Sequence, residues 1–240
     1  MMTLLRLMAF REGLGDILAD GTKAAAKKIG KGAEKYAMHV KGLELPAYDV
    51  RGAKAHGLNY ATSYTGADHN RGYAFQEIFG IPVPYAVDRF AVEGKGKLTK
   101  WNQDLRSATC DAPTMCAFLL DMAVPAIAAQ NTADLMEAVT GLKYTPEEIR
   151  KVGERMNNLA RAFNVREGFT RADDTLPERL MTEPLKAGAS KGQMISKEDL
   201  NQMLDEYYTE RGWNLRTGAP TRQKLTELGL GYVAEQLGAR

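Results

Sequence analysis

The feature that most constrains the fold is a hydrophobic pattern with helical spacing, which dominates the chain from its middle onward. After Thr145 and Pro146, apolar residues recur at intervals of three and four, at Ile149, Val152, Met156, Leu159 and Phe163. We expect Thr145 to cap this helix and Pro146 to occupy its first turn, where a missing N–H costs nothing. Glu147 and Glu148 then lie at the positive end of the helix dipole. The segment predicts a long amphipathic helix.

Further helices are predicted between cap and stop residues. Ser196 and Gly212 enclose one whose apolar stripe is Leu200, Met203, Leu204, Tyr207 and Tyr208. Shorter helices are expected from Thr132 to Gly141 in "TADLMEAVTG" and from Thr221 in "TRQKLTELG", and "LTKWNQDLRSA" places Leu98, Trp101 and Leu105 on one face. No run alternates with period two, and no Asn-Gly or Asp-Gly pair marks a hairpin. The fold class is therefore predicted as all-α (mainly α), an irregular multi-helix domain.

The N-terminal part of the chain differs from the rest. Residues 1–38 are rich in Ala, Gly and Lys and predict short helices that end near Gly30 and Gly32. The stretch that follows, "GLELPAYDVRGAKAHGLNYATSYTGADHNRGY", shows neither helical nor strand period. We expect a long irregular loop there, and ordered loops of such length are often functional.

Composition excludes several classes of protein. Lys and Arg total 32 against 30 Asp and Glu, a net charge of +2, so the chain has no overall charge that would favour nucleic acid or an anionic membrane. Two cysteines make no disulfide framework, which favours a reducing compartment. "MMTLLRLMAF" lacks the basic segment and cleavage site of a signal peptide, and "MCAFLLDMAVPAIAA" is too short to span a bilayer. We predict a cytoplasmic protein.

Three histidines are candidates for acid–base chemistry. His69 lies in the irregular stretch between Asp68 and Arg71, whose opposite charges would shift its pKa in opposite directions. His39 and His56 have no such neighbours and are interpreted as surface or core groups. His69 is therefore the preferred candidate.

The segment "CDAPTMCAF" holds both cysteines of the chain. Free cysteine is among the most buried residue types, so Cys110 and Cys116 can each be a small core residue, and for Cys116 a functional thiol is an equal alternative. Asp111 stands where an apolar helix is expected to begin, so it can be an N-cap or can accept hydrogen bonds from a ligand held there.

The chain resembles the C-terminal portion of the tungsten-containing aldehyde ferredoxin oxidoreductase family. The resemblance rests on "VKGLELPAYDVRGAKAHGLNYATSYTGADHNRGY", "NVREGFTRADDTLPERLMTEPLKAGASKGQ" and "LDEYYTERGWN", which follow in the family's order between about Phe10 and Leu230. It implies that residues 1–38 are the helical tail of the family's middle domain. Residues 39–240 would then form its C-terminal α-helical domain.

The resemblance also implies roles for the cysteine segment. Family members carry D-x-x-G-L-C here, and Asp111, Met115 and Cys116 match its aspartate, leucine and cysteine. The aspartate would hydrogen-bond a pterin and the cysteine would be the fourth ligand of a 4Fe–4S cluster, chemistry that suits a carboxylate and a thiolate. Thr114 stands where the motif has glycine, so the turn is expected to differ.

The same resemblance implies a catalytic role for His69, which matches a histidine close to tungsten that is proposed to hydrogen-bond or protonate the substrate oxygen. Arg71 takes a position that is basic in relatives and is assigned with Asp111, Met115 and Cys116 to cofactor binding. Asp68 replaces a cysteine that many relatives carry, which implies a different substrate pocket.

The implied cofactors are a tungsten-bis-pterin and a 4Fe–4S cluster, and the implied partners are a polypeptide with the pterin-binding domain and three cluster cysteines, ferredoxin and a small aldehyde. Two cysteines cannot hold a four-ligand cluster, so the chain alone is expected to carry neither cofactor and to be inactive. Two hypotheses remain: the C-terminal part of an oxidoreductase that oxidises aldehydes to carboxylic acids, or a truncated all-α interaction module without the chemistry. Thr114 favours the second, and the joint presence of Asp111, Cys116 and His69 favours the first.

Overall fold

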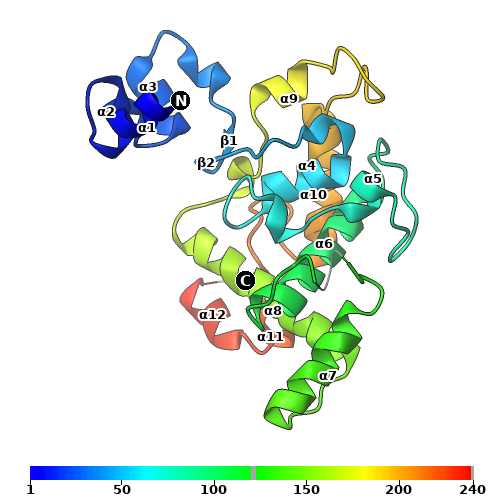
Figure 1. The fold of residues 1–240 in the computed structure, drawn as a ribbon. Helices are drawn as coiled ribbons and strands as arrows, with labels where there is room; N and C mark the ends of the chain where they lie inside the picture. The colour runs from blue at the N-terminus through cyan, green and yellow to red at the C-terminus, as the bar shows by residue number, and fades with distance from the viewer. Residues whose placement is uncertain (120–122, 239–240) are drawn as a thin grey trace.

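Three short helices at the N-terminus stand together, apart from the main body of the chain (Figure 1). The computed structural model describes residues 1–119 and 123–238. The three helices are α1 (Met2–Ala9), α2 (Leu14–Leu18) and α3 (Thr22–Ile29). Gly30 follows α3 with a positive φ of 64°, which agrees with the predicted stop. No residue of α1 is buried, and the side chains of Met2, Leu4 and Leu5 are exposed.

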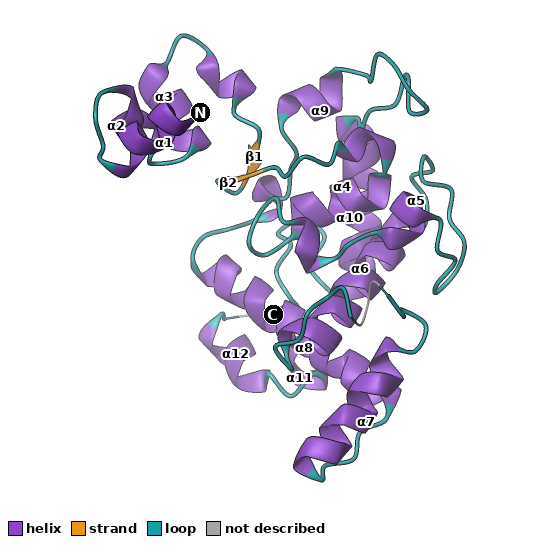
Figure 2. Ribbon diagram, viewed as in Figure 1, coloured by secondary structure: helices purple, strands orange, loops and turns teal. Residues whose placement is uncertain are grey.

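Two very short strands connect this group to the main body (Figure 2). Strands β1 (His39–Val40) and β2 (Leu43–Glu44) pair antiparallel, with Val40 opposite Leu43. They form the one sheet within the described residues, and the remainder of the regular structure there is helical. The predicted mainly α fold class is confirmed.

The main body is built around α6 (Lys95–Arg106), which packs against three other helices: α4 (Lys54–Thr62), α8 (Pro146–Arg166) and α10 (Lys197–Arg211). The other helices are α5 (Phe75–Phe79), α7 (Ala128–Thr140), α9 (Glu178–Thr182), α11 (Arg222–Glu227) and α12 (Gly231–Gln236). Leu98 and Leu105 of α6 are fully buried, as the sequence pattern predicts. No helix within the described ranges is both long and apolar enough to cross a bilayer.

The predicted caps of the two longest helices are confirmed. The Thr145 hydroxyl accepts from Glu148 N at 3.2 Å, and the Glu148 carboxylate accepts from Thr145 N at 2.8 Å. The pair forms a reciprocal capping box. Ser196 accepts from Asp199 N at 3.0 Å, and Gly212 ends α10 in the left-handed conformation at φ 67°.

Helix α7 begins five residues earlier than predicted, because its cap is Ile127 and not Thr132. Thr132 lies inside the helix and is buried, and its hydroxyl donates to the Ala128 carbonyl at 2.8 Å. A threonine can satisfy its hydroxyl in this way within a helix, so its presence alone does not mark the first residue. Gly141 does end α7 in the left-handed conformation.

The long irregular loop predicted after Gly42 contains a helix, so that prediction is wrong for residues 54–62. All nine residues of α4 are buried. A helix buried on every side has no apolar and polar face, so its sequence shows no helical period. Burial of the whole helix therefore removed the signal that would have predicted it.

Candidate functional site

His69 lies in a short turn that three hydrogen bonds hold in place. The Asp68 carboxylate accepts from Asn70 N at 2.8 Å and from Arg71 Nε at 3.0 Å. Asn59 of α4 donates from Nδ2 to the Asp68 carbonyl at 3.1 Å. The buried helix thus fixes the backbone on which His69 stands.

Arg71 joins this turn to Asp111, which is 40 residues further along the chain. Its Nη1 lies 3.1 Å from Asp111 Oδ2 and donates to Tyr64 Oη at 2.8 Å, while Nε binds Asp68. Burial opposes the charge of Arg71, but the hydrogen bond to Tyr64 and the two carboxylates outweigh it and raise the pKa of the guanidinium. One planar cation therefore bridges two predicted parts of the site.

One interpretation of the sequence made Asp111 the N-cap of a helix, and the structure shows that this is wrong. It is the last residue of a π-helical turn, Ser107–Asp111, that continues directly from α6. Asp111 Oδ2 accepts from Arg71 and from Tyr64 Oη at 3.4 Å, and Oδ1 accepts no hydrogen bond within the described part of the chain. π-Helical turns are rare in proteins, and those that occur often lie at functional sites.

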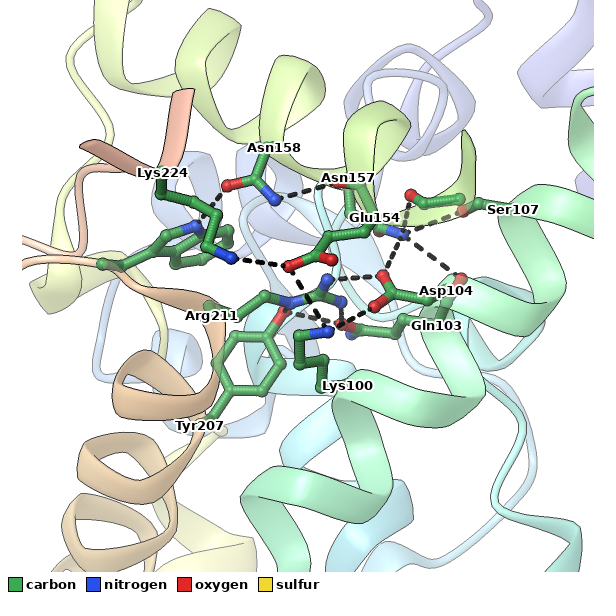
Figure 3. A network of polar contacts seen from close by, with 12 residues as sticks. Lys100, Gln103, Asp104, Ser107, Glu154, Asn157, Asn158, Tyr207, Arg211 and Lys224 are labelled. Carbon is green, nitrogen blue, oxygen red and sulfur yellow. Dashed lines mark hydrogen bonds and ion pairs between the residues drawn. The ribbon is translucent and has the colours of Figure 1, made fainter. Parts of the chain in front are cut away.

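The π-helical turn is held by close contact with α8. A Cβ added at Gly153 would lie 1.9 Å from the Asp104 carbonyl oxygen and 3.0 Å from Ala108 N, so only glycine allows this approach. Asn157, one turn later on α8, donates from Nδ2 to Ser107 Oγ at 3.1 Å and to Asp104 Oδ1 at 3.1 Å. Figure 3 shows Asn157 facing Asp104 and Ser107. Both contacts anchor the segment that presents Asp111.

A buried polar network links the same end of α6 to the His69 turn. Arg211 of α10 pairs with Asp104 and donates to Gln103 Oε1 at 2.8 Å, and Tyr207 also donates to that oxygen at 2.6 Å (Figure 3). The amide nitrogen of Gln103 then donates to Asn59 Oδ1 at 3.1 Å. Because Asn59 in turn binds the Asp68 carbonyl, α6 positions Asp111 directly and His69 through α4.

The turn after Asp111 has the backbone conformation that a glycine would favour. Thr114 has φ 56°, in the left-handed region that side chains with a Cβ adopt only at a cost. Met115 N donates to the Cys110 carbonyl at 2.8 Å and closes the turn. Thr114 thus occupies a strained position at the place where the motif of the resemblance has glycine.

The two cysteines differ sharply in exposure. Cys110 is buried, whereas Cys116 is exposed. The interpretation of Cys116 as a small core residue is therefore wrong. The apolar residues that suggested it do not enclose Cys116: Phe118 and Leu119 are themselves 71% and 69% exposed. Residues 120–122 of the apolar window lie outside the described residues.

His69 is half-buried between two tyrosine rings. Its ring centroid lies 5.2 Å from that of Tyr48 and 5.9 Å from that of Tyr73. Burial lowers the pKa of His69; Asp68 opposes this shift and Arg106 adds to it. The imidazole makes no hydrogen bond within the described residues, so both ring nitrogens are available to a ligand. Burial thus favours the neutral form of the His69 imidazole, which can accept a proton.

His56, which was interpreted from the sequence as a surface or core group, lies in the same cluster of rings. Its centroid is 5.7 Å from that of Tyr48, 5.1 Å from that of Tyr73 and 4.9 Å from that of Tyr60. Burial lowers the pKa of His56 to about 3, and proximity to His69 adds to the shift. The helical spacing of His56 and Tyr60 was the available signal, but it was hidden because α4 itself was not recognised.

The described residues include no group of three or more His, Cys, Asp or Glu side chains that could hold a metal ion. Cys116 offers one exposed thiol. That donor set fits one ligand position of a thiolate-bound cluster and cannot hold a cluster by itself.

Comparison with known proteins places these features in context. Residues 1–230 match the family model described as aldehyde ferredoxin oxidoreductase, domains 2 and 3. A tungsten-containing aldehyde ferredoxin oxidoreductase of Pyrococcus furiosus is 40% identical over 226 residues, which cover 93% of this chain and 35% of that protein. The corresponding protein of Thermococcus kodakarensis is 39% identical over the same length and with the same coverage.

More distant similarity extends to enzymes with other substrates. The WOR-like subunit of an aliphatic sulfonate oxidoreductase from P. furiosus is 31% identical over 246 residues, 98% of this chain and 35% of that protein. Among solved structures, a chain of the active-site complex BamBC of benzoyl coenzyme A reductase, in complex with 1,5-dienoyl-CoA, superposes with a TM-score of 0.72 at 28% identity. The match covers 97% of this chain and 39% of that chain. The chain thus spans about a third of the length of the proteins it matches.

Proposed function

Because the chain belongs to the aldehyde ferredoxin oxidoreductase family, we propose that it forms the C-terminal part of a tungstopterin iron–sulfur enzyme that oxidises aldehydes to carboxylic acids, with ferredoxin as the electron acceptor. The curated relatives are about three times longer, since the match covers 35% of each. The rest of the site therefore comes from polypeptide outside these 240 residues, including the pterin-binding domain and three cluster cysteines.

The observation that carries this proposal is the Arg71 bridge. It holds the His69 turn and Asp111 together by contacts of 3.0 Å to Asp68 and 3.1 Å to Asp111. Arg71 and Asp111, which the resemblance assigns to cofactor binding, are thereby joined to the turn that carries His69. This arrangement supports the proposal because it places the two assigned parts of the site side by side.

Asp111 is proposed to bind the pterin through its carboxylate. Oδ2 is occupied by Arg71 and Tyr64, and Oδ1 is left to accept hydrogen bonds from an amino-pterin ring. The side chain is 21% exposed, so a ligand can reach it. Arg71 pairs with the negative charge of the carboxylate through Oδ2 and so orients it. Met115 lies in the turn that follows Asp111 and is assigned to the same ligand.

Cys116 is proposed to supply the fourth thiolate of a 4Fe–4S cluster. Its exposure on the described surface suits a ligand whose cluster is bound mainly by another part of the protein. When bound, tungsten and the cluster would supply the two-electron oxidation of the aldehyde and the one-electron transfer to ferredoxin. The protein residues named here bind and orient, and move a proton.

His69 is proposed to exchange the proton at the substrate oxygen. Burial favours the neutral form of the imidazole, and neither ring nitrogen is engaged by the described residues. A neutral imidazole held between two tyrosine rings can accept a proton as the acid forms and return it to solvent. The proposed reaction is RCHO + H2O → RCOOH + 2 H⁺ + 2 e⁻, and a bound cluster would supply the route for the two electrons to ferredoxin.

The exposed apolar surface is proposed to be covered by the rest of the enzyme. Met2, Leu5 and Phe10 in and next to α1 are 78%, 48% and 68% exposed. Phe118 and Leu119 form a second exposed pair beside Cys116. Large exposed apolar side chains gathered in this way mark contact surfaces.

The proposal is tested by producing the chain together with the N-terminal portion of an aldehyde ferredoxin oxidoreductase, followed by measurement of iron, tungsten and pterin and of aldehyde-dependent ferredoxin reduction. We expect both parts to co-purify with all three components and to be active. A folded complex without cofactors would support the alternative of an interaction module. The matched control is His39→Ala, which should leave activity unchanged.

A further inference from the structure

Two histidines and two tyrosines lie together in a cluster of rings, which Tyr60 extends beside His56 and Phe79 extends beside Tyr73. Tyr48 contacts His56 at 5.7 Å and His69 at 5.2 Å between ring centroids, and Tyr73 contacts the same two at 5.1 and 5.9 Å. The two tyrosine rings are 5.7 Å apart and nearly perpendicular. Each tyrosine therefore contacts both imidazoles; Tyr73 is buried, His69 is half-buried and Tyr48 is 43% exposed.

His56 is the fixed member of the group. Its backbone N–H and that of Ala55 are bound by the carboxylate of Glu77 at 3.2 and 3.1 Å, which holds the first turn of α4. Its Nδ1 accepts from Ala74 N at 3.4 Å, and the side chain is 1% exposed. Lys95 in turn pairs with Glu77 at 2.6 Å. Every constraint on His56 comes from buried structure.

His56 contributes to this group by packing its ring against the two tyrosines. Its Nε2 has no hydrogen-bond partner within the described residues. Burial also keeps the ring neutral, since its pKa falls to about 3. A buried polar atom left without a partner costs roughly 1–3 kcal/mol, so the Nε2 atom does not add to the stability of the fold and the ring itself is what packs here.

We propose that His56 is a positioning residue for His69, which it holds in place through the rings of Tyr48 and Tyr73. The inference rests on the proposed role of His69 as the proton-exchanging group. The titratable and charged neighbours of His69 are Asp68, Arg106, Tyr48, Tyr73 and His56 itself. His56 acts on His69 by keeping these two rings packed against it, so that the imidazole stays desolvated and oriented toward the substrate.

The test begins on the 240-residue chain, by NMR titration of its three histidines with His69→Gln used for assignment. In His56→Ala the tyrosine rings lose their support and solvent reaches His69, so the His69 midpoint should rise toward the ordinary histidine value. His56→Phe keeps a ring of similar size and should restore the wild-type midpoint. Leu225→Ala, a core substitution in the separate cluster around α11, should lower stability without moving the His69 midpoint. An unchanged His69 midpoint in folded His56→Ala would overturn the proposal.

The second arm uses the assembled enzyme. His56→Ala should lower kcat on the order of 10- to 100-fold with little change in KM, because misplacement of a reacting group by about 1 Å can cost that much. His56→Phe should recover most of the loss. A shifted midpoint combined with an inactive wild-type complex would refute the proposed function but leave the positioning role intact. A shifted midpoint with unchanged kcat would refute the role of His56 in catalysis.

Discussion

Arg71 and Asp111 form an ion pair at 3.1 Å across 40 residues of sequence, and the same guanidinium binds Asp68 at 3.0 Å. This cation connects the turn that carries His69 to the turn that leads to Cys116. Its side chain is 26% exposed, so the pair is only partly screened by water. The relative placement of the two turns therefore depends on Arg71.

Arg71→Met is expected to lower the free energy of unfolding by about 1–3 kcal/mol, because Asp68 and Asp111 lose their shared donor while still partly buried. Chemical denaturation of the folded chain measures this change. Arg71→Lys is the matched control: it keeps the charge but cannot reach both carboxylates with a planar fork, so it should recover only part of the loss. Full stability in Arg71→Met would show that the bridge does not hold the turns.

Gly153→Ala is expected to destabilise the chain by about 1–3 kcal/mol or more, because the added methyl would meet backbone atoms of the π-helical turn. The structure gives a Cβ–oxygen distance of 1.9 Å to Asp104, which side-chain rotation cannot relieve. Gly231→Ala is the control, since nothing lies within 4 Å of its Cβ position. Thermal unfolding of both variants measures the difference, and equal stability would mean that α8 and the turn are not in close contact.

The two thiols should react at very different rates in the chain alone. Cys116 is exposed and Cys110 is buried, so Ellman's reagent should modify one thiol rapidly and the second only after unfolding. Cys116→Ser should abolish the fast phase, and Cys110→Ser should leave it unchanged. Rapid reaction of both thiols in the folded chain would contradict the structure of this turn.

His56 should make the free energy of unfolding decrease as the pH is lowered below 6.5, the ordinary pKa of histidine. Burial lowers its folded-state pKa to about 3 from 6.5, so the unfolded chain binds one more proton between these values. The contribution is fully present above pH 6.5 and is lost as the pH falls, with a slope of about 1.4 kcal/mol per pH unit. The folded-state pKa values of His39 and His69 are also lowered and act in the same direction.

His56→Phe isolates the contribution of His56 to this slope. Between pH 6.5 and about 4, above most carboxylate pKa values, the variant should lose stability more gradually than the wild type. Denaturation midpoints at a series of pH values measure the two slopes. Identical slopes would show that His56 takes up its proton in the folded state.

The sequence was sufficient for the elements whose signals are local. Thr145 and Ser196 cap the helices that begin after them, and Gly212 ends its helix in the left-handed conformation, because each acts on its own neighbours. The sequence was not sufficient for α4, since a helix buried on every face shows no period. The resemblance supplied Asp111 and His69 as candidates, but the contacts through Arg71 and Asn59 depend on tertiary packing that spacing does not reveal.

The role of Cys116 as the fourth ligand of a 4Fe–4S cluster is tested most directly by electron paramagnetic resonance. The sample is the dithionite-reduced complex between this chain and an N-terminal portion that carries three cluster cysteines. We expect a 4Fe–4S signal that is lost or shifted in Cys116→Ser and unchanged in Cys110→Ser, because Cys116 is exposed and Cys110 is buried. An identical signal in the wild type and in folded Cys116→Ser would contradict the claim that this chain completes the cluster site.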